Sequence, residues 1–399
     1  MERYSHTRFT VNFSEAKTSL EKLQKLLKVP NAIHDITINF YENTEENYWL
    51  LTNLFAFHAL ARFCLDSLES DKVFDILITA IPKDRLKVDA LTLKNLRGCG
   101  FDSREHISYA RLPTAISAFS YIDKLCLSKM RFQGTEFESL CTALSGARTV
   151  TELDLSENPL CVTRMLALGQ TLRNNPSILS LDLFMCGITD TVLQALTLSL
   201  TKKSTLKMLF LRSNNITSMS VIPPSLEELS LPDNPLGAYA FIRMHRAIAA
   251  NTHLKRLSFG GAAQNQIVIS EPLPPVFGTN NTLVYCDISY VRFSPAVLDD
   301  LCQDLHHNTS MIEMRVNGAW RMEFSVHRFA ELMRANTTLR VFLPECSFGT
   351  DFVTYDYGAI VHNPSITNMP SLQRLGVFGG KQLLDRTKHN LYHKSLSLA

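Results

Sequence analysis

Aromatic and charged side chains recur beside short leucine-containing segments of this chain, and their chemistry is that of recognition. They alternate with the leucines or follow them directly, so we expect them on the opposite face of the same strand. Aromatic residues and Arg dominate the binding energy of many protein interfaces, and mixed charges add specificity. The candidate partner-binding residues are Asp154, Asp182, Phe184, Met185, Phe210, Arg212, Arg256, Tyr285, Asp287, Tyr290, Glu313 and Arg315. The same alternation predicts that Ser128, Ser156 and Ser180 are exposed on that face.

The motifs of known catalytic and metal sites are missing from the sequence. It has no H-E-x-x-H, no G-x-S-x-G and no Cys/His spacing typical of a metal site. The segment GVFGGKQ (376–382) is similar to a phosphate-binding loop, but it is one spacer residue short and has Gln in place of Ser or Thr. We therefore expect no enzyme activity, no cofactor and no bound metal.

The elements that position the candidate residues are short repeated segments between Val150 and Leu236. They read VTELDLSENPL, ILSLDLFMCGI, LKMLFLRSNNI and LEELSLPDNPL. Each fits the pattern L-x-x-L-x-L-x-x-N/C-x-L of leucine-rich repeats. Their central leucines are Leu153, Leu181 and Leu209, at intervals of 28 residues, and then Leu229 after 20.

This pattern predicts a strand followed by a turn in each repeat. The L-x-L core places two apolar side chains on one face of a strand, because successive residues point to opposite faces. The Asn or Cys that follows is suited to hydrogen-bond the backbone of the turn. One repeat cannot bury its own apolar face, so the repeats must stack.

Helical spacing separates the strands, as at Phe137, Leu140, Cys141 and Leu144. Through the motifs ALGQTLRNNPSILSLDL and RMHRAIAANTHLKRLSF, the chain resembles the ribonuclease-inhibitor-like leucine-rich repeat proteins. The resemblance implies an α/β solenoid, or horseshoe, with a parallel inner β-sheet and outer helices. It also implies binding of other proteins on the concave face, and it carries over no catalytic residue.

The same register extends in both directions and predicts about 13 or 14 repeats. Further strand centres are expected at Leu125 and Leu91, weaker ones at Phe63, Ile36 and Phe9, and later ones at Leu257, Cys286, Met314, Phe342 and Leu375. The array then covers residues 1–379, with degenerate repeats in 1–110 and a capping segment at 380–399. Two alternatives stay open: a long helix through 60–66, and a separate helical module in 1–110.

Prolines interrupt the outer side at two places. Pro223 and Pro224 lie in the 20-residue interval, which leaves no room for a helix. Pro272, Pro274 and Pro275 exclude a regular helix between the strands centred on Leu257 and Cys286. That segment is expected to be extended or to form a single turn.

Composition limits the classes of partner and compartment. The net charge is +2 and 20% of the residues are charged, which favours neither nucleic acid nor a membrane surface as partner. The first residues lack the apolar core of a signal peptide, and the nine cysteines form no C-x-x-C pair. We expect a monomer in the reducing cytoplasm.

The sequence therefore predicts a protein-interaction scaffold that binds a partner protein on its concave face. Degenerate 28-residue repeats of this style resemble those of effectors that bacteria secrete into host cells, which would place the chain in the host cytosol. A substrate-recognition subunit of a ubiquitin ligase is one alternative. A GTPase-activating protein is another, with Arg97, Arg104 or Arg111 as candidate finger residues. The aromatic loop at 348–357 is an alternative contact region.

Overall fold

The computed structural model describes most of residues 109–320 and shorter pieces on either side. The described residues are 8–12, 35–39, 53–54, 60–66, 74, 78, 87–93, 109–201, 204–219, 221–261, 267–320, 332, 335–336, 338–339 and 341–346. They divide between two compact units: unit 1 is Met1–Phe210 and unit 2 is Leu211–Ala399.

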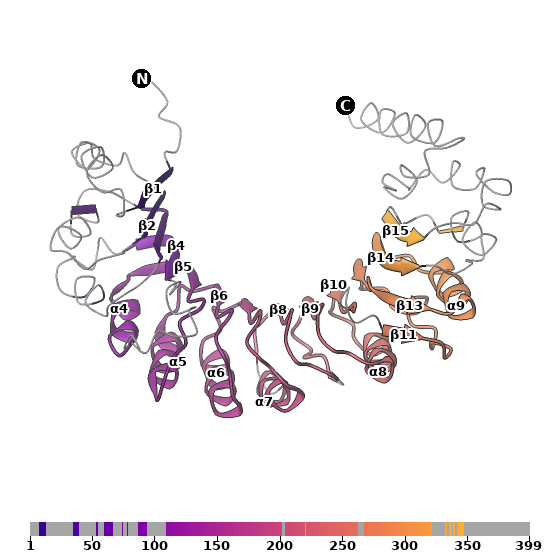
Figure 1. The fold of residues 1–399 in the computed structure, drawn as a ribbon, viewed down its shortest axis with the longest axis horizontal. Coiled ribbons are helices and arrows are strands. Elements are labelled where there is room, and N and C mark those ends of the chain that lie inside the picture. The colour runs from indigo at the N-terminus through magenta and orange to yellow at the C-terminus, as the bar shows by residue number, and fades with distance from the viewer. Residues whose placement is uncertain are drawn as a thin grey trace, which may run out of the picture. The chain divides into compact units, whose positions relative to one another are not determined.

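Unit 1 is a parallel sheet whose strands follow one another in chain order. The strands are β1 (Arg8–Asn12), β2 (Asp35–Asn39), β3 (Arg62–Asp66), β4 (Lys87–Leu93), β5 (Tyr121–Cys126), β6 (Glu152–Asp154), β7 (Ser180–Asp182) and β8 (Met208–Phe210). The helices are α4 (Leu112–Ala118), α5 (Glu136–Gly146), α6 (Val162–Asn174) and α7 (Asp190–Leu200). These helices stand side by side on one side of the sheet (Figure 1). The opposite side is called the inner face.

The register of unit 1 is the predicted one. The paired centres are Phe9, Ile36, Phe63, Leu91, Leu125, Leu153, Leu181 and Leu209. Residues 62–66 form a strand, so the alternative of a long helix through 60–66 is wrong there. Phe63 and Leu65, two positions apart, are both buried, as a strand with one core face requires.

Unit 2 has the same architecture with fewer helices among its described residues. Its inner sheet has the order β9 (Glu228–Ser230), β10 (Arg256–Ser258), β12 (Tyr285–Asp287), β14 (Glu313–Trp320) and β15 (Val341–Cys346). Its helices are α8 (Ala238–Ala249) and α9 (Pro295–His306). The predicted centres Leu229, Leu257, Cys286, Met314 and Phe342 pair in register. Leu375, the loop at 348–357 and the segment 380–399 lie outside the described residues.

The described residues of the proline-rich segment in unit 2, 267–280, form no helix, as predicted. β11 (Ile267–Ile269) is followed by residues 270–276, which form neither helix nor strand, and by a turn at 277–279. β11 pairs in parallel with β13 (Val291–Phe293) and forms a second, two-stranded sheet on the outer side, near α8 and α9. The sequence did not predict this small sheet.

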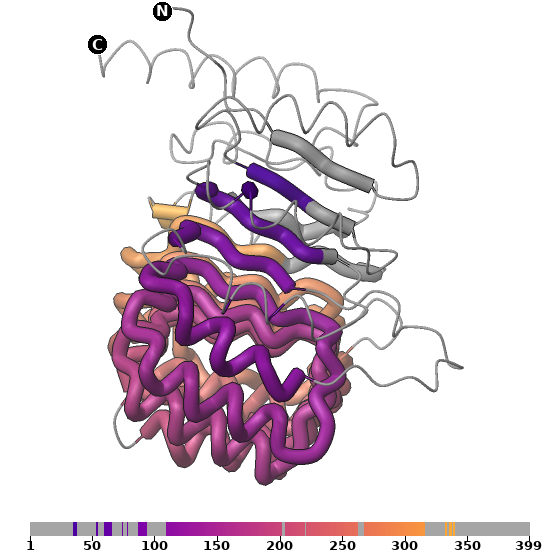
Figure 2. The backbone as a smooth tube through the Cα atoms, turned by 90° about the vertical axis from the view of Figure 1, so that its left-hand side faces the viewer, coloured from indigo at the N-terminus to yellow at the C-terminus, as the bar shows by residue number. Residues whose placement is uncertain are grey.

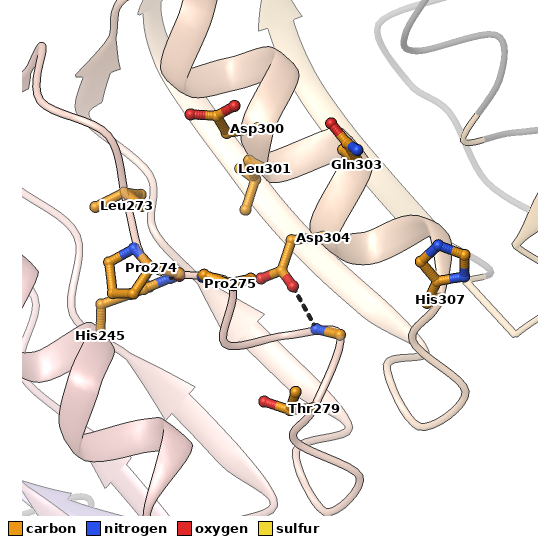
Figure 3. Close-up of a pocket in the computed structure, with 11 residues that line it drawn as sticks. His245, Leu273, Pro274, Pro275, Thr279, Asp300, Leu301, Gln303, Asp304 and His307 are labelled. Carbon is orange, nitrogen blue, oxygen red and sulfur yellow. Dashed lines mark hydrogen bonds between the residues drawn. The ribbon is translucent and has the colours of Figure 1, made fainter.

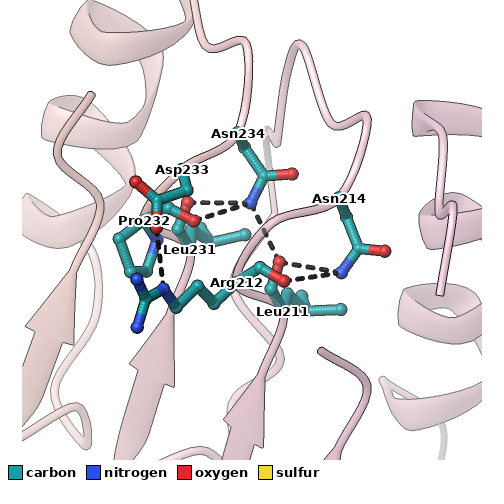
Figure 4. A network of polar contacts seen from close by, with 7 residues as sticks. All are labelled: Leu211, Arg212, Asn214, Leu231, Pro232, Asp233 and Asn234. Atoms are coloured by element: carbon teal, nitrogen blue, oxygen red, sulfur yellow. Dashed lines mark hydrogen bonds and ion pairs between the residues drawn. The ribbon is translucent and has the colours of Figure 1, made fainter. Parts of the chain in front are cut away.

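Leucines of the strands and helices fill the core, and asparagines join the turns. Figure 2 shows the coils of unit 1 stacked one behind another. Buried Asn158 donates its amide to the carbonyls of Leu127, at 2.8 Å, and Leu155, at 2.9 Å. In unit 2, Asn234 likewise donates to Leu211, at 2.9 Å, and Leu231, at 2.8 Å (Figure 4). The polar position of the repeat therefore has the predicted role of satisfying turn carbonyls.

Of the helices formed by the described residues, none has both the length and the apolar character to span a bilayer.

Candidate functional site

Three neighbouring strands of unit 2 bring a cluster of aromatic and charged side chains together on the inner face. The register aligns Arg256 of β10 with Tyr285 of β12, and Tyr285 with Glu313 of β14. Two positions further along, Ser258, Asp287 and Arg315 align. Between these rows Leu257, Cys286 and Met314 are fully buried in the core. Alternation along each strand therefore places the candidate residues on the face opposite the helices, as predicted.

Tyr285 is the centre of this cluster because two guanidinium groups stack on its ring. The Cζ of Arg256 lies 4.3 Å from the ring centroid and that of Arg315 lies 5.5 Å from it. Both distances are within the range of cation–π attraction. Burial raises the pKa of Tyr285 to about 12, and the Asp287 carboxylate adds to the effect. The phenol is therefore a neutral hydrogen-bond donor at physiological pH.

Carboxylates hold the two arginines through one nitrogen each. The Nε of Arg315 donates to Glu313 at 2.6 Å, and the Nε of Arg256 lies 3.5 Å from a carboxylate oxygen of Glu228. Within the described part of the chain, the terminal Nη groups of these arginines have no hydrogen-bond partner, and their side chains are about half exposed. The guanidinium planes are thus oriented while several donors stay available.

The aspartates that follow the strand centres also support the turns. The Oδ1 of Asp287 accepts from the Ser289 N–H at 2.9 Å. Asp154 and Asp182 likewise accept the backbone N–H of the residue two positions later in the chain, at 2.8 and 2.9 Å. This is the geometry of an Asx-turn, in which a side chain satisfies the local backbone. These candidate residues therefore have a structural role that the sequence analysis did not assign.

In unit 1 the candidate residues line a shallow acidic hollow on the inner face. It has a volume of about 360 Å³, and its lining includes Lys124, Glu152, Asp154, Asp182 and Phe210. Lys124 is bound to Glu152 at 2.7 Å. Burial raises the pKa of Asp182, and the neighbouring Asp154 carboxylate contributes to the shift. The repulsion between the two carboxylates makes this hollow suited to a positively charged group.

Met185 and Tyr290 project from the turns after the strands. Both have a positive φ, 52° and 61°, and both are exposed. Phe184 is half-buried beside Met185. In unit 2, Arg212 donates through Nε to Asp233 at 2.7 Å and is otherwise exposed (Figure 4).

Three serines assigned to the exposed face are buried instead. Ser128, Ser156 and Ser180 are no more than 9% exposed. A serine hydroxyl ends close to the backbone, where longer side chains on neighbouring strands leave little accessible surface. Alternation predicts the face of a residue correctly, but it does not predict whether a short side chain reaches solvent.

No group of His, Cys, Asp and Glu side chains in the described ranges is arranged to hold a metal ion.

Comparisons with known proteins give the following similarities. A family model described as "Leucine Rich repeat" matches residues 174–196. Among solved structures, the leucine-rich repeat-containing protein LegL7 from Legionella pneumophila is similar with 14% identity and a TM-score of 0.41, over 96% of this chain and 97% of that one. A chain of the Rad7 and Elc1 complex from yeast is similar with 14% identity and a TM-score of 0.36, over 77% of this chain and 83% of that one. No curated protein matches the sequence. The repeat match and the parallel register of the strands identify the fold as an α/β leucine-rich-repeat solenoid.

Proposed function

We propose that this protein is a non-catalytic interaction scaffold that binds a partner protein through the inner face of its repeat sheet. The observation that carries the proposal is the stack of Arg256 and Arg315 on Tyr285. Tyr and Arg at the centre of a surface are the residue types most often responsible for binding energy. No fold requirement accounts for three such side chains together on one face.

The stack is suited to binding because its side chains are already ordered. Glu228 and Glu313 fix the guanidinium groups through Nε, so less side-chain entropy is lost when a partner docks. The Nη groups are available to donate hydrogen bonds to carboxylates or backbone carbonyls of the partner. The acidic hollow at Asp154 and Asp182 in unit 1 provides a second candidate contact, for a basic side chain.

The experiment is affinity capture with the full-length chain, followed by measurement of the Kd for the captured partner. Tyr285→Ala removes the ring on which both arginines stack and is expected to weaken binding by about 30-fold, a loss of about 2 kcal/mol. Tyr285→Phe keeps the ring and is expected to retain most of the affinity.

Tyr239→Ala is the matched control, because Tyr239 is a highly exposed tyrosine on α8, away from the inner sheet. It is expected to bind as the wild type does. An unchanged Kd for Tyr285→Ala, or a loss confined to Tyr239→Ala, would exclude the inner face as the binding surface.

We further propose that the protein acts as a monomer in the cytoplasm, and that a bacterium delivers it into a host cell as an effector. The support for delivery is the sequence style of degenerate 28-residue repeats. A reporter enzyme fused to the chain, and active only in host cytosol, tests this. Reporter signal in host cells exposed to bacteria that carry the fusion supports delivery, and absence of signal in those host cells contradicts it.

A further inference from the structure

The outer side of unit 2 contains a hollow between α8 and α9. Pro272, Pro274 and Pro275 lie between these two helices, and residues 270–276 there form no helix. The hollow has a volume of about 490 Å³, which is within the size range of small-molecule pockets. Figure 3 shows its lining. The hollow lies on the side of the sheet that carries the helices, and the inner face is the opposite side.

The lining combines apolar and acidic side chains. Leu273, Pro274, Pro275 and Leu301 supply apolar surface, and α9 contributes Asp300 and Asp304 (Figure 3). Neither Lys nor Arg lines the hollow among the described residues. Asp304 lies in the last turn of α9, where the partial negative charge of the helix end adds to that of the carboxylates. The electrostatic environment therefore favours a cation.

The carboxylates of Asp300 and Asp304 differ in their hydrogen bonding. Asp304 is fixed because it accepts the backbone N–H groups of Val276, Phe277 and Gly278, at 2.6 to 2.8 Å. Asp300 is exposed, and within the described ranges it has neither an ion pair nor a side-chain hydrogen bond. Asp304 therefore shapes the hollow, whereas Asp300 is available to a ligand.

His245 of α8 supplies a buried polar group without a full set of partners. It is 1% exposed, and its Nε2 lies 2.9 Å from the Pro274 carbonyl oxygen. A carbonyl only accepts, so Nε2 carries the hydrogen and Nδ1 is left as an acceptor. That Nδ1 has no hydrogen-bond partner in the described structure. Burial lowers the pKa of His245 to about 4, so the ring is neutral and does not repel a cation.

We propose that this hollow binds an organic cation with an apolar body, supplied either by a free amine or by a basic side chain of a partner protein. The apolar body packs on Leu273, the prolines and Leu301, and the charged head faces Asp300. A donor that reaches His245 would also satisfy its Nδ1, a buried acceptor without a hydrogen-bond partner in the described structure. This site is independent of the inner-face scaffold function.

The probe for the experiment is benzamidine, with neutral benzamide as its near-isostere, titrated into the full-length chain by ligand-observed NMR. Benzamidine is expected to bind at least ten times more tightly than benzamide. Asp300→Asn is expected to weaken benzamidine binding by at least three-fold, and Thr279→Trp, which places a large ring at the exposed rim, is expected to abolish it. Asp89→Asn, at an exposed position of β4, is the matched charge control and should bind normally.

Several outcomes overturn the proposal. They are absence of benzamidine binding, equal binding of benzamide, and binding that neither Asp300→Asn nor Thr279→Trp changes. Competition then distinguishes the source of the cation. Displacement of benzamidine by spermidine supports a free amine, and displacement by a capped Gly-Arg-Gly peptide supports a basic side chain. Displacement by neither would also overturn the proposal.

Discussion

Asn308 donates its side-chain amide to the backbone carbonyl of Asn280, 3.0 Å away in the preceding repeat of unit 2. Asn280 makes the same contact with Asn251, and Asn336 makes it with Asn308, each at 3.0 Å. Asn175 occupies the equivalent position in unit 1 and donates to Ala147 at 3.0 Å. A second asparagine ladder therefore joins the turns that precede the strands, in addition to the ladder that follows them.

We predict that Asn308→Ala strongly destabilises unit 2. The amide also donates to Phe277, and its oxygen accepts the N–H groups of Ser310 and Met311. Alanine would leave these buried backbone groups unpaired, so the free energy of unfolding should fall by about 3 kcal/mol or more. The measurement is urea denaturation. Asn215→Ala, the same change at an exposed asparagine, should shift the midpoint little. Equal midpoints for the two variants would refute the role of the ladder.

A second prediction concerns Gly260, which follows β10. A Cβ at this position would lie 2.0 Å from the backbone oxygen of Ser289. Ser289 is held by its N–H bond to Asp287, so the backbone cannot yield easily. Gly260→Ala should therefore lower the free energy of unfolding by about 3 kcal/mol. Gly146→Ala in α5 is the control, because nothing lies within 4 Å of its added Cβ. An unfolding midpoint for Gly260→Ala equal to that of the wild type would contradict the prediction, because the backbone would then have moved to accommodate the added Cβ.

The strand positions could be predicted from the sequence because the repeat leaves little freedom. Leu153 and Leu181 each begin an L-x-L unit, and a shift of one residue would expose both leucines to solvent. The constant interval then fixes which residues are neighbours in the sheet. The constant interval correctly predicted the positions of β2 and β3, where the leucine motif is weak. It also predicted that Tyr285 and Arg256 lie on the inner face.

Contacts between particular side chains could not be predicted in this way. The stack of Arg315 on Tyr285 depends on rotamers and on carboxylates from neighbouring strands. Asn280 and Asn308 bind backbone carbonyls, which carry no residue-type signal at the accepting position. The hollow at His245 arises from the absence of a helix, and the sequence predicted that absence without showing what lines the space.

Thiol reactivity gives a third prediction. Cys161, at the N-cap of α6, is exposed, whereas Cys141 is buried. Burial raises the pKa values of Cys126 and Cys141 to about 12, so little of either is thiolate at pH 8. In the reaction of the native protein with Ellman's reagent, Cys161→Ser should reduce the number of fast-reacting thiols by one. Cys126→Ser, a matched change at a half-buried thiol bonded to Asp154, should leave that phase intact. A fast phase that persists fully in Cys161→Ser would contradict the assignment.

The last prediction is a pH dependence of stability that originates at His245. Its pKa falls from an ordinary 6.5 to about 4 because the ring is buried. Between these values the unfolded chain binds a proton that the folded chain does not, so acidification favours unfolding. His245 should therefore reduce the free energy of unfolding progressively as the pH falls from about 6.5 to 4, by about 3 kcal/mol in total.

His245→Phe tests this origin, because phenylalanine keeps an aromatic ring beside Phe241 and Phe277 but does not titrate. The variant loses the hydrogen bond to Pro274 and should be less stable at pH 7. Its stability should nevertheless fall less steeply than that of the wild type, by up to about 1.4 kcal/mol per pH unit, in urea titrations from pH 7 to 4.5. His253→Phe, at an exposed position of the same unit, should retain the wild-type slope. Identical slopes for His245→Phe and the wild type would mean that the acid sensitivity arises from other groups. Burial of the His245 imidazole would then not be its cause.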